Sequence, residues 1–132
     1  MTEKKQKMLY LFRGPCGCGK TTLREALIGR LFLPGLDMSD IDRGVDMAAR
    51  VNMPADWLRR NRKAGVVWIE GVFAPGSPSL TKVLAEAEAQ DRVVQHVVAF
   101  TGADEIRRRI GDDSGRCGLG VKYVGVFEMA LE

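Results

Sequence analysis

A glycine-rich stretch that begins at Gly14 contains residue types that bind phosphate in proteins. It reads Gly14-Pro15-Cys16-Gly17-Cys18-Gly19-Lys20-Thr21 and matches the pattern G-x-x-x-x-G-K-[ST] at every fixed position. Glycines let successive backbone N–H groups turn towards one anion, because no Cβ obstructs the approach. The lysine can reach the β- and γ-phosphates of a nucleotide, and the threonine hydroxyl can ligate Mg²⁺. The stretch therefore predicts a phosphate-binding loop (P-loop) at residues 14–21, with Thr22 as a further phosphate contact.

Two cysteines in the same stretch offer a second interpretation, a metal site. Cys16 and Cys18 would supply two of the four ligands of a structural zinc site, and His96 and Cys117 are the only other histidine and cysteine. His96 lies in a predicted strand, where a histidine is more often part of the sheet. We therefore expect Cys16 and Cys18 to be spacers within the P-loop. With three cysteines in all, we expect reduced thiols and not a closed disulfide framework.

The elements on either side of the P-loop fit the phosphate interpretation. The apolar residues at 8–12 predict a strand that is buried on both faces. Residues 21–31 predict a helix with a buried stripe of Leu23, Leu27 and Leu31. A strand, the motif and then a helix is the order in which a P-loop occurs.

Strands and helices alternate along the rest of the chain. The first half predicts a brief strand at 31–33, a helix from Ser39 or Asp40 to about Arg50, and a helix from Pro54 to just before Gly65. The second half predicts strands at 66–73, 92–100 and 121–129, with helices at 80–87 and 103–110. This alternation predicts a single domain over residues 1–132, with an α/β fold of three layers around a parallel sheet of about five strands.

Glu70 follows four apolar residues in the strand predicted at 66–73. An acidic residue at a strand end beside a P-loop can hold the water shell of Mg²⁺. Together with the P-loop, Glu70-Gly71 resembles the P-loop kinases, in particular uridine-kinase-like proteins, whose corresponding strand ends in Glu-Gly. The resemblance covers residues 8 to about 110. It implies a kinase-type P-loop NTPase fold, ATP and Mg²⁺ as cofactors, Lys20 as a catalytic residue, and Thr21 and Glu70 at the metal. The sequence has no Asn-Lys-x-Asp motif and no Asp-x-x-Gly after a strand, which GTPases would need.

The acidic residues at 37–42 include the candidates for a catalytic base. P-loop kinases carry an aspartate after the second strand that accepts the proton of the attacking hydroxyl, and polynucleotide kinases carry an Asp-x-x-Arg pair there. Asp40 and Arg43 have this spacing, and positions i and i+3 share one face of a helix. Asp37 and Asp42 compete with Asp40 for the role of the base. An aspartate at a helix start is also a common cap, so both interpretations of Asp40 stay open.

Consecutive arginines follow the strand predicted at 92–100. Kinases of the resembling group carry an arginine-bearing lid after the fourth strand, where a guanidinium neutralises charge that develops during transfer. The resemblance implies this role for Arg107 or Arg108. A basic helix that faces solvent is the alternative.

A second basic cluster bears on the phosphate acceptor. It consists of Trp57, Arg59, Arg60, Arg62 and Lys63. Such residues suit a phosphate backbone and a stacked base. The cluster favours DNA or another nucleic acid as the substrate. The hydroxyl would be a polynucleotide 5′-hydroxyl or a 5-hydroxymethylpyrimidine in DNA, by resemblance to phage kinases that phosphorylate 5-hydroxymethyluracil. A nucleoside or nucleotide kinase is the first alternative, and a nucleotide-binding switch that transfers no phosphate is the second.

Composition and charge bear on the surroundings of the protein. Hydrophobic residues make up 45% of the chain and the net charge is +3, as in ordinary globular proteins. No apolar run approaches the roughly 20 residues that span a bilayer, and the charged start is unlike a signal peptide. We expect a cytoplasmic protein without a membrane partner. An uncovered sheet edge could be covered by the last segment of the chain or by a second copy, which would form a homodimer.

Overall fold

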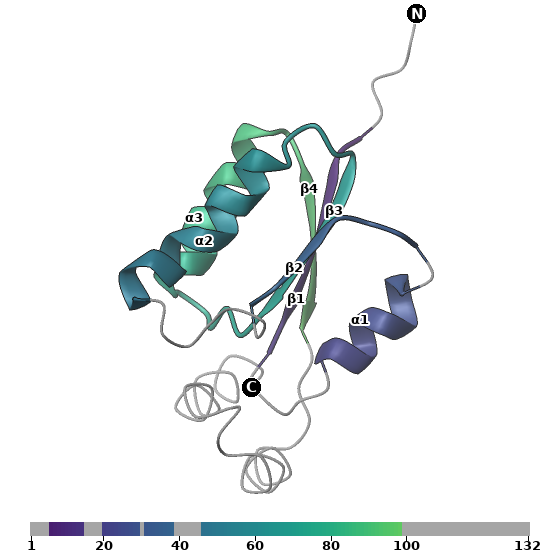
Figure 1. Ribbon diagram of the computed structural model, residues 1–132, viewed down its shortest axis with the longest axis horizontal. Helices are drawn as coiled ribbons and strands as arrows, with labels where there is room; N and C mark the ends of the chain where they lie inside the picture. Colours follow the sequence, from purple (N-terminus) through teal and green to yellow (C-terminus); the bar gives the residue numbers. More distant parts are fainter. Residues whose placement is uncertain (1–5, 15–19, 30, 39–45, 99–132) are drawn as a thin grey trace, which may run out of the picture.

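The computed structural model describes residues 6–14, 20–29, 31–38 and 46–98. The described strands form one parallel sheet in the order β2-β3-β1-β4. They are β1 (Met8–Arg13), β2 (Gly35–Asp37), β3 (Val66–Gly71) and β4 (Val93–Val98). One face carries α1 (Lys20–Ile28), and the other carries α2 (Met47–Arg60) and α3 (Pro78–Ala89) side by side (Figure 1). The predicted three-layer α/β fold is therefore confirmed.

The main core lies between the sheet and the pair α2 and α3. Alternate side chains of β1 and β3 point into it, and Leu58 of α2 meets them from the opposite layer. Its buried members are Leu9, Leu11, Leu58, Val67, Ile69, Phe73, Leu80, Val83 and Ala87. Phe12, which alternates with Leu11 along β1, is also fully buried. Because β1 is covered on both faces, its sequence is a continuous apolar run and does not alternate.

The middle of the chain differs from the sequence-based expectation at Pro54. We predicted a helix that ends near Arg50 and a second helix that starts at Pro54, but α2 continues through Pro54 from Met47 to Arg60. Proline removes one backbone hydrogen bond and disfavours a helix interior. Here the Pro54 side chain is among the fully buried ones, so its packing offsets the local penalty. The helix begins at the cap Asp46, whose side chain accepts from the backbone N–H of Ala48 at 3.4 Å.

The second strand also lies elsewhere than predicted. Leu31 and Phe32, which we placed in a strand, are 58% and 104% exposed, and β2 instead begins at Gly35. The ring of Trp68 on β3 lies so close that a Cβ on residue 35 would be 1.8 Å from Trp68 Cε2. Only glycine allows the backbone to approach the ring in this way. This close contact across the strands has no local signature in the sequence.

The buried face of α1 was also predicted incorrectly. Leu27 is 57% exposed, whereas its neighbour Ile28 is 6% exposed. Lys20, Arg24 and Ile28 are spaced four apart and share one helical face. This face is turned towards the sheet because its polar members have partners there, described below.

The remaining predicted elements are confirmed or lie outside the described residues. The structure confirms the strands at β1, β3 and β4, and a helix within Pro78–Ala89 that buries Leu80, Val83 and Ala87. The helix predicted at 103–110, the strand predicted at 121–129 and the proposed caps Ser39 and Asp40 lie outside the described residues.

Arg92 connects the amino ends of three strands through hydrogen bonds. It directly precedes β4 and is 6% exposed. The guanidinium donates to Gln90 Oε1 and to the carbonyl oxygens of Met8, Asn61, Ala64 and Gly65, over 2.7–3.3 Å. Burial lowers the pKa of this guanidinium, and the acceptors replace the water that it loses. The starts of β1 and β3 are thereby joined to the start of β4.

We predict that Arg92→Met lowers the free energy of unfolding by about 2–4 kcal/mol, because several partly buried carbonyl oxygens lose the guanidinium as a donor. Urea unfolding followed by far-UV circular dichroism measures the change. Lys82→Met on the exposed face of α3 is the matched control and should change stability by less than about 0.5 kcal/mol. Equal stabilities of the two variants would contradict this role of Arg92.

Candidate active site

The two ends of the P-loop meet at the carboxyl end of β1. Gly14 follows β1 with φ 152°, a backbone conformation that favours glycine, and its N–H donates to Val72 O at 3.2 Å. Lys20 begins α1, and its Nζ donates to Gly14 O at 2.8 Å. The ammonium group is therefore held at the start of the predicted phosphate cradle, next to the positive end of a helix dipole.

Thr21 and Glu70 form one polar contact between α1 and β3. Thr21 Oγ1 donates to Glu70 Oε2 at 2.8 Å, and Glu70 is 2% exposed. β3 lies next to β1 in the sheet, with Glu70 paired to Phe12 in the register. The sequence prediction that Glu70 lies beside the P-loop is consistent with this placement.

Arg24 occupies the other oxygen of the same carboxylate. Its Nε donates to Glu70 Oε1 at 2.9 Å, and its Cζ lies 4.1 Å from the centroid of the Trp68 ring. Both donors to Glu70 come from one face of α1, which explains why that face and not the leucine stripe meets the sheet. A buried carboxylate requires such partners, because desolvation without them is costly.

The donor set at this site suits Mg²⁺. Hydroxyl and carboxylate oxygens are hard ligands, and Mg²⁺ in nucleotide sites is usually held by one or two protein oxygens together with phosphate and water. Thr21 would ligate the ion directly and Glu70 through water. In the part of the chain that the structure describes, no group of three or more His, Cys, Asp or Glu side chains could form a separate metal site.

Asp37 is the one predicted base candidate within the described residues. It ends β2 and is paired with Glu70 in the register. Neighbouring strands lie about 4.8 Å apart and paired residues share a face of the sheet. Asp37 is therefore at the same edge as Lys20 and Thr21, where an acceptor hydroxyl would approach the phosphates.

The turn after Glu70 explains the glycine that follows it. Phe73 has φ 40°, which is unusual for a bulky residue, and its side chain is buried. A Cβ on Gly71 would lie 2.6 Å from Phe73 Cε2, so glycine at 71 leaves room for the ring. Arg13 Nε donates to Phe73 O at 3.1 Å, and Arg13 Nη1 lies 3.2 Å from His96 Nδ1. His96 is thus an exposed residue of β4 beside Arg13.

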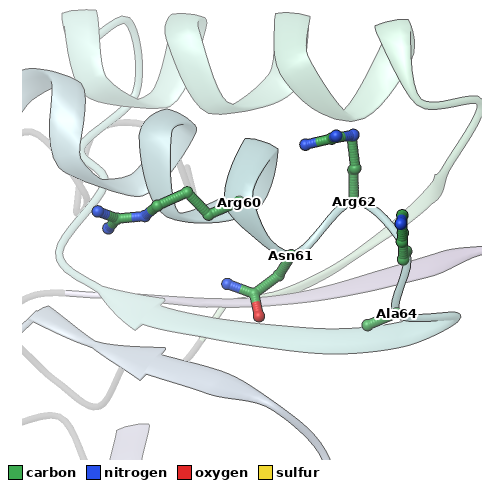
Figure 2. Close-up of a pocket in the computed structure, with 5 residues that line it drawn as sticks. Arg60, Asn61, Arg62 and Ala64 are labelled. Carbon is green, nitrogen blue, oxygen red and sulfur yellow. The ribbon is translucent and has the colours of Figure 1, made fainter.

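The basic cluster at the end of α2 lies at the opposite edge of the sheet from Lys20. The register pairs Met8 with Val66 at the amino ends of β1 and β3, and Lys7 Nζ donates to Arg62 O at 2.7 Å. A strand of this length spans about 20 Å. Around the cluster lies a hollow of about 330 Å³ (Figure 2), lined by Arg60, Asn61, Arg62, Lys63 and Ala64.

Two members of the cluster have partners that a nucleic acid would have to replace. Arg59 Nε donates to Glu86 Oε1 on α3 at 2.6 Å, and Arg59 Nη1 lies 3.5 Å from Asp56 Oδ1. Trp57 is partly buried and packs against the main core. The Arg59 side chain is 62% exposed despite these ion pairs, and Arg60, Arg62 and Lys63 are exposed as well.

Several predicted site residues lie outside the described residues. They are Pro15, Cys16, Gly17, Cys18 and Gly19 of the P-loop, Asp40, Asp42 and Arg43, and the lid arginines Arg107 and Arg108. Thr22 is described and its side chain is exposed.

Sequence reasoning missed Arg24, Trp68 and Gly35. A signal was available for two of them: Arg24 lies three residues after Thr21 on a helix, and Trp68 lies two residues before Glu70 on a strand. Both spacings place side chains on a shared face. Gly35 had no such signal, because its partner is on another strand.

Several solved structures have a fold similar to that of this chain. The protein APE1195 matches with a TM-score of 0.63 and 19% identity, over 89% of this chain and 77% of that one. A candidate kinase from Chloroflexus aurantiacus J-10-fl matches with a TM-score of 0.64 and 15% identity, over 92% of this chain and 76% of that one. Shikimate kinase from Acinetobacter baumannii, in complex with shikimate, matches with a TM-score of 0.53 and 21% identity, over 84% and 65%. The chain has the fold of a P-loop kinase.

Similarity at the level of sequence is not found: no protein-family model and no curated protein matches the chain. The P-loop kinase fold is therefore supported by structure and by the motif residues. No helix among the described residues is long and apolar enough to cross a membrane.

His96 should give this P-loop kinase fold a small pH dependence of stability. Partial desolvation of the His96 ring, which is only in part exposed to solvent, and then the charge of Arg13 lower the pKa of His96 below its ordinary value of 6.5. The unfolded chain then binds the proton more readily than the folded chain, so stability falls as the pH falls through 6.5 towards the folded-state pKa. His96 is the only histidine, and His96→Gln should lose less stability than the natural chain between pH 7.5 and pH 5.5 (about one unit either side of the ordinary value) in urea unfolding. The same loss in both proteins would contradict the effect.

Proposed function

We propose that this chain is an ATP-dependent phosphotransferase that requires Mg²⁺ and transfers the γ-phosphoryl group to a hydroxyl. The observation that carries the proposal is the pair of contacts Lys20–Gly14 and Thr21–Glu70 at one edge of the sheet. These contacts bring together the lysine and the hydroxyl of the P-loop motif and the acidic residue at the end of β3. They occur in a chain whose strand order and helix layers belong to the same fold. The kinase names of two structures with this fold add support.

Each residue has a distinct role in the proposed reaction. Lys20 would stabilise charge on the transferring phosphoryl group, since a preorganised cation is most effective where charge develops. Thr21 and Glu70 would hold Mg²⁺, and the ion would neutralise negative charge on the phosphates. Asp37 is the described candidate for the base, and Asp40 with Arg43 is the alternative that the polynucleotide-kinase resemblance favours. Arg107 or Arg108 would close over the phosphates.

We consider two classes of phosphate acceptor, and one function without an acceptor. A nucleic-acid hydroxyl, of a 5′ end or of a 5-hydroxymethylpyrimidine in DNA, follows from the resemblance and from the basic cluster. A small-molecule acceptor, such as a nucleoside or a nucleotide, is favoured by the position of that cluster, because Arg62 lies at the sheet edge opposite Lys20. A nucleotide-binding switch without transfer is the third candidate and would need no base.

We predict that Lys20→Ala lowers kcat by about 10²–10³-fold, because one preorganised cation is removed from the transferring group. The assay follows label from γ-labelled ATP in Mg²⁺ to four acceptors: a 5′-hydroxyl oligonucleotide, a hydroxymethylated duplex, free nucleosides and shikimate. Lys82→Ala makes the same substitution on the exposed face of α3 and should retain full activity. Transfer that persists in Lys20→Ala would refute the P-loop assignment, and transfer to no acceptor would favour the switch.

A nucleic-acid substrate predicts a further effect of charge. Replacing Arg60, Arg62 and Lys63 together by Gln should raise KM for an oligonucleotide and reduce the salt dependence of its affinity by up to about three units of slope. Phosphorylation of a nucleoside should not change, and Lys82→Gln is the matched control. An oligonucleotide KM that is independent of both salt and these substitutions would contradict binding at this cluster.

A further inference from the structure

Arg24 lies outside the P-loop motif, yet its side chain contacts the acidic residue of the candidate site. We propose that Arg24 is a positioning residue: it fixes the carboxylate of Glu70, so that Glu70 fixes the hydroxyl of Thr21 for metal binding. We infer further that Trp68, held by Gly35, keeps Arg24 in place. The inference rests on the proposed function because it takes Thr21 as a ligand of nucleotide-bound Mg²⁺.

The guanidinium of Arg24 has two anchors that restrict its position. Nε donates to Glu70 Oε1 at 2.9 Å, and the Arg24 side chain is only 16% exposed. Cζ lies 4.1 Å from the centroid of the Trp68 ring, within the distance of a cation–π contact. A long side chain that is held at both its edge and its face loses the freedom that arginine normally has at a surface.

The carboxylate of Glu70 is in turn restricted at both oxygens. Oε1 accepts from Arg24 and Oε2 accepts from Thr21 Oγ1 at 2.8 Å. A threonine hydroxyl has one proton to donate and two lone pairs. Because its proton is directed at Glu70, the lone pairs of Thr21 Oγ1 point away from Glu70, and a cation needs those lone pairs. Fixing the carboxylate therefore fixes the direction in which Thr21 can ligate.

Trp68 is fixed from the side of β2. A Cβ on residue 35 would lie 1.8 Å from Cε2, 2.2 Å from Cδ2 and 2.3 Å from Cζ2 of the ring, so the ring lies directly against the Gly35 backbone. Trp68 and Glu70 are two residues apart on β3 and share a face. The ring that stacks on Arg24 and the carboxylate that it pairs with are thus carried by one strand.

A simpler role for Arg24 makes the opposite prediction. If the arginine only neutralised the charge of Glu70, its removal would leave a more negative site, and Mg²⁺ would bind more tightly. Lysine would then replace arginine without loss. If Arg24 orients Glu70, metal binding weakens without it, and lysine fails because it lacks the planar guanidinium that stacks and donates at fixed angles.

The test measures the dissociation constant of ADP by calorimetry, once with Mg²⁺ and once with EDTA. The ratio of the two constants is the metal enhancement. We expect Arg24→Lys and Arg24→Met each to lower this enhancement by about tenfold or more, as is usual when a group that orients a metal ligand is lost. ADP binding in EDTA should stay unchanged, because it depends on the P-loop and Lys20. Glu25→Met, at the next and exposed position of α1, is the control and should keep the full enhancement.

A second variant tests the same contacts without altering Arg24. Gly35→Ala should displace Trp68 and lower the metal enhancement in the same direction. The chain has two tryptophans, so in a Trp57→Phe background the fluorescence is that of Trp68 alone. Without nucleotide, Arg24→Met and Gly35→Ala should both change its emission.

The outcomes separate the positioning role from the proposed function. Full enhancement in Arg24→Lys, tighter metal binding in Arg24→Met, or no metal enhancement in the natural chain would overturn the positioning role. A natural chain that binds ADP with a metal enhancement sensitive to Arg24, but transfers no phosphate to any acceptor, would contradict the phosphotransferase and support the positioning role.

Discussion

The buried carboxylate of Glu70 is the group on which the arrangement of the candidate site depends. At 2% exposure it has lost its water and requires donors from the protein. Both donors, Thr21 and Arg24, come from α1, so the rotation of this helix about its own axis is set by a polar contact. Leu27 is left in solvent as a result. The same rotation directs Lys20, one residue before Thr21, at the carbonyl of Gly14.

The amino and carboxyl ends of the strands are held by opposite kinds of charge. At the amino ends, a buried cation is surrounded by main-chain carbonyls, with Arg92 joining three strands. At the carboxyl ends, a buried anion is surrounded by side chains from a helix. The first arrangement uses backbone acceptors that any sequence would provide. The second requires particular side chains at particular positions. It lies at the carboxyl ends of the strands, where ligands are expected to bind in open α/β sheets.

Local patterns account for the parts that the sequence predicts well. β1 and β3 are continuous apolar runs, α3 has a clear helical period and the P-loop is a contiguous motif, so each could be predicted from neighbouring residues. The errors arise where distant residues decide. Pro54 stays within α2 because its side chain is buried, and β2 begins at Gly35 because Trp68 lies against it. The spacing of Arg24 after Thr21 indicates a shared helical face, but its partners are more than forty positions away in the chain, at β3.

The contact between Gly35 and Trp68 also constrains how such a sequence can diverge. Any larger residue at position 35 removes the space for an indole at 68, and without the indole the guanidinium at 24 loses its stacking partner. Single substitutions at these positions are therefore unfavourable, whereas a coordinated replacement of all three can be neutral. The three positions, on separate elements, are therefore expected to change together, and covariation among them would mark which distant relatives retain the same contacts around Glu70.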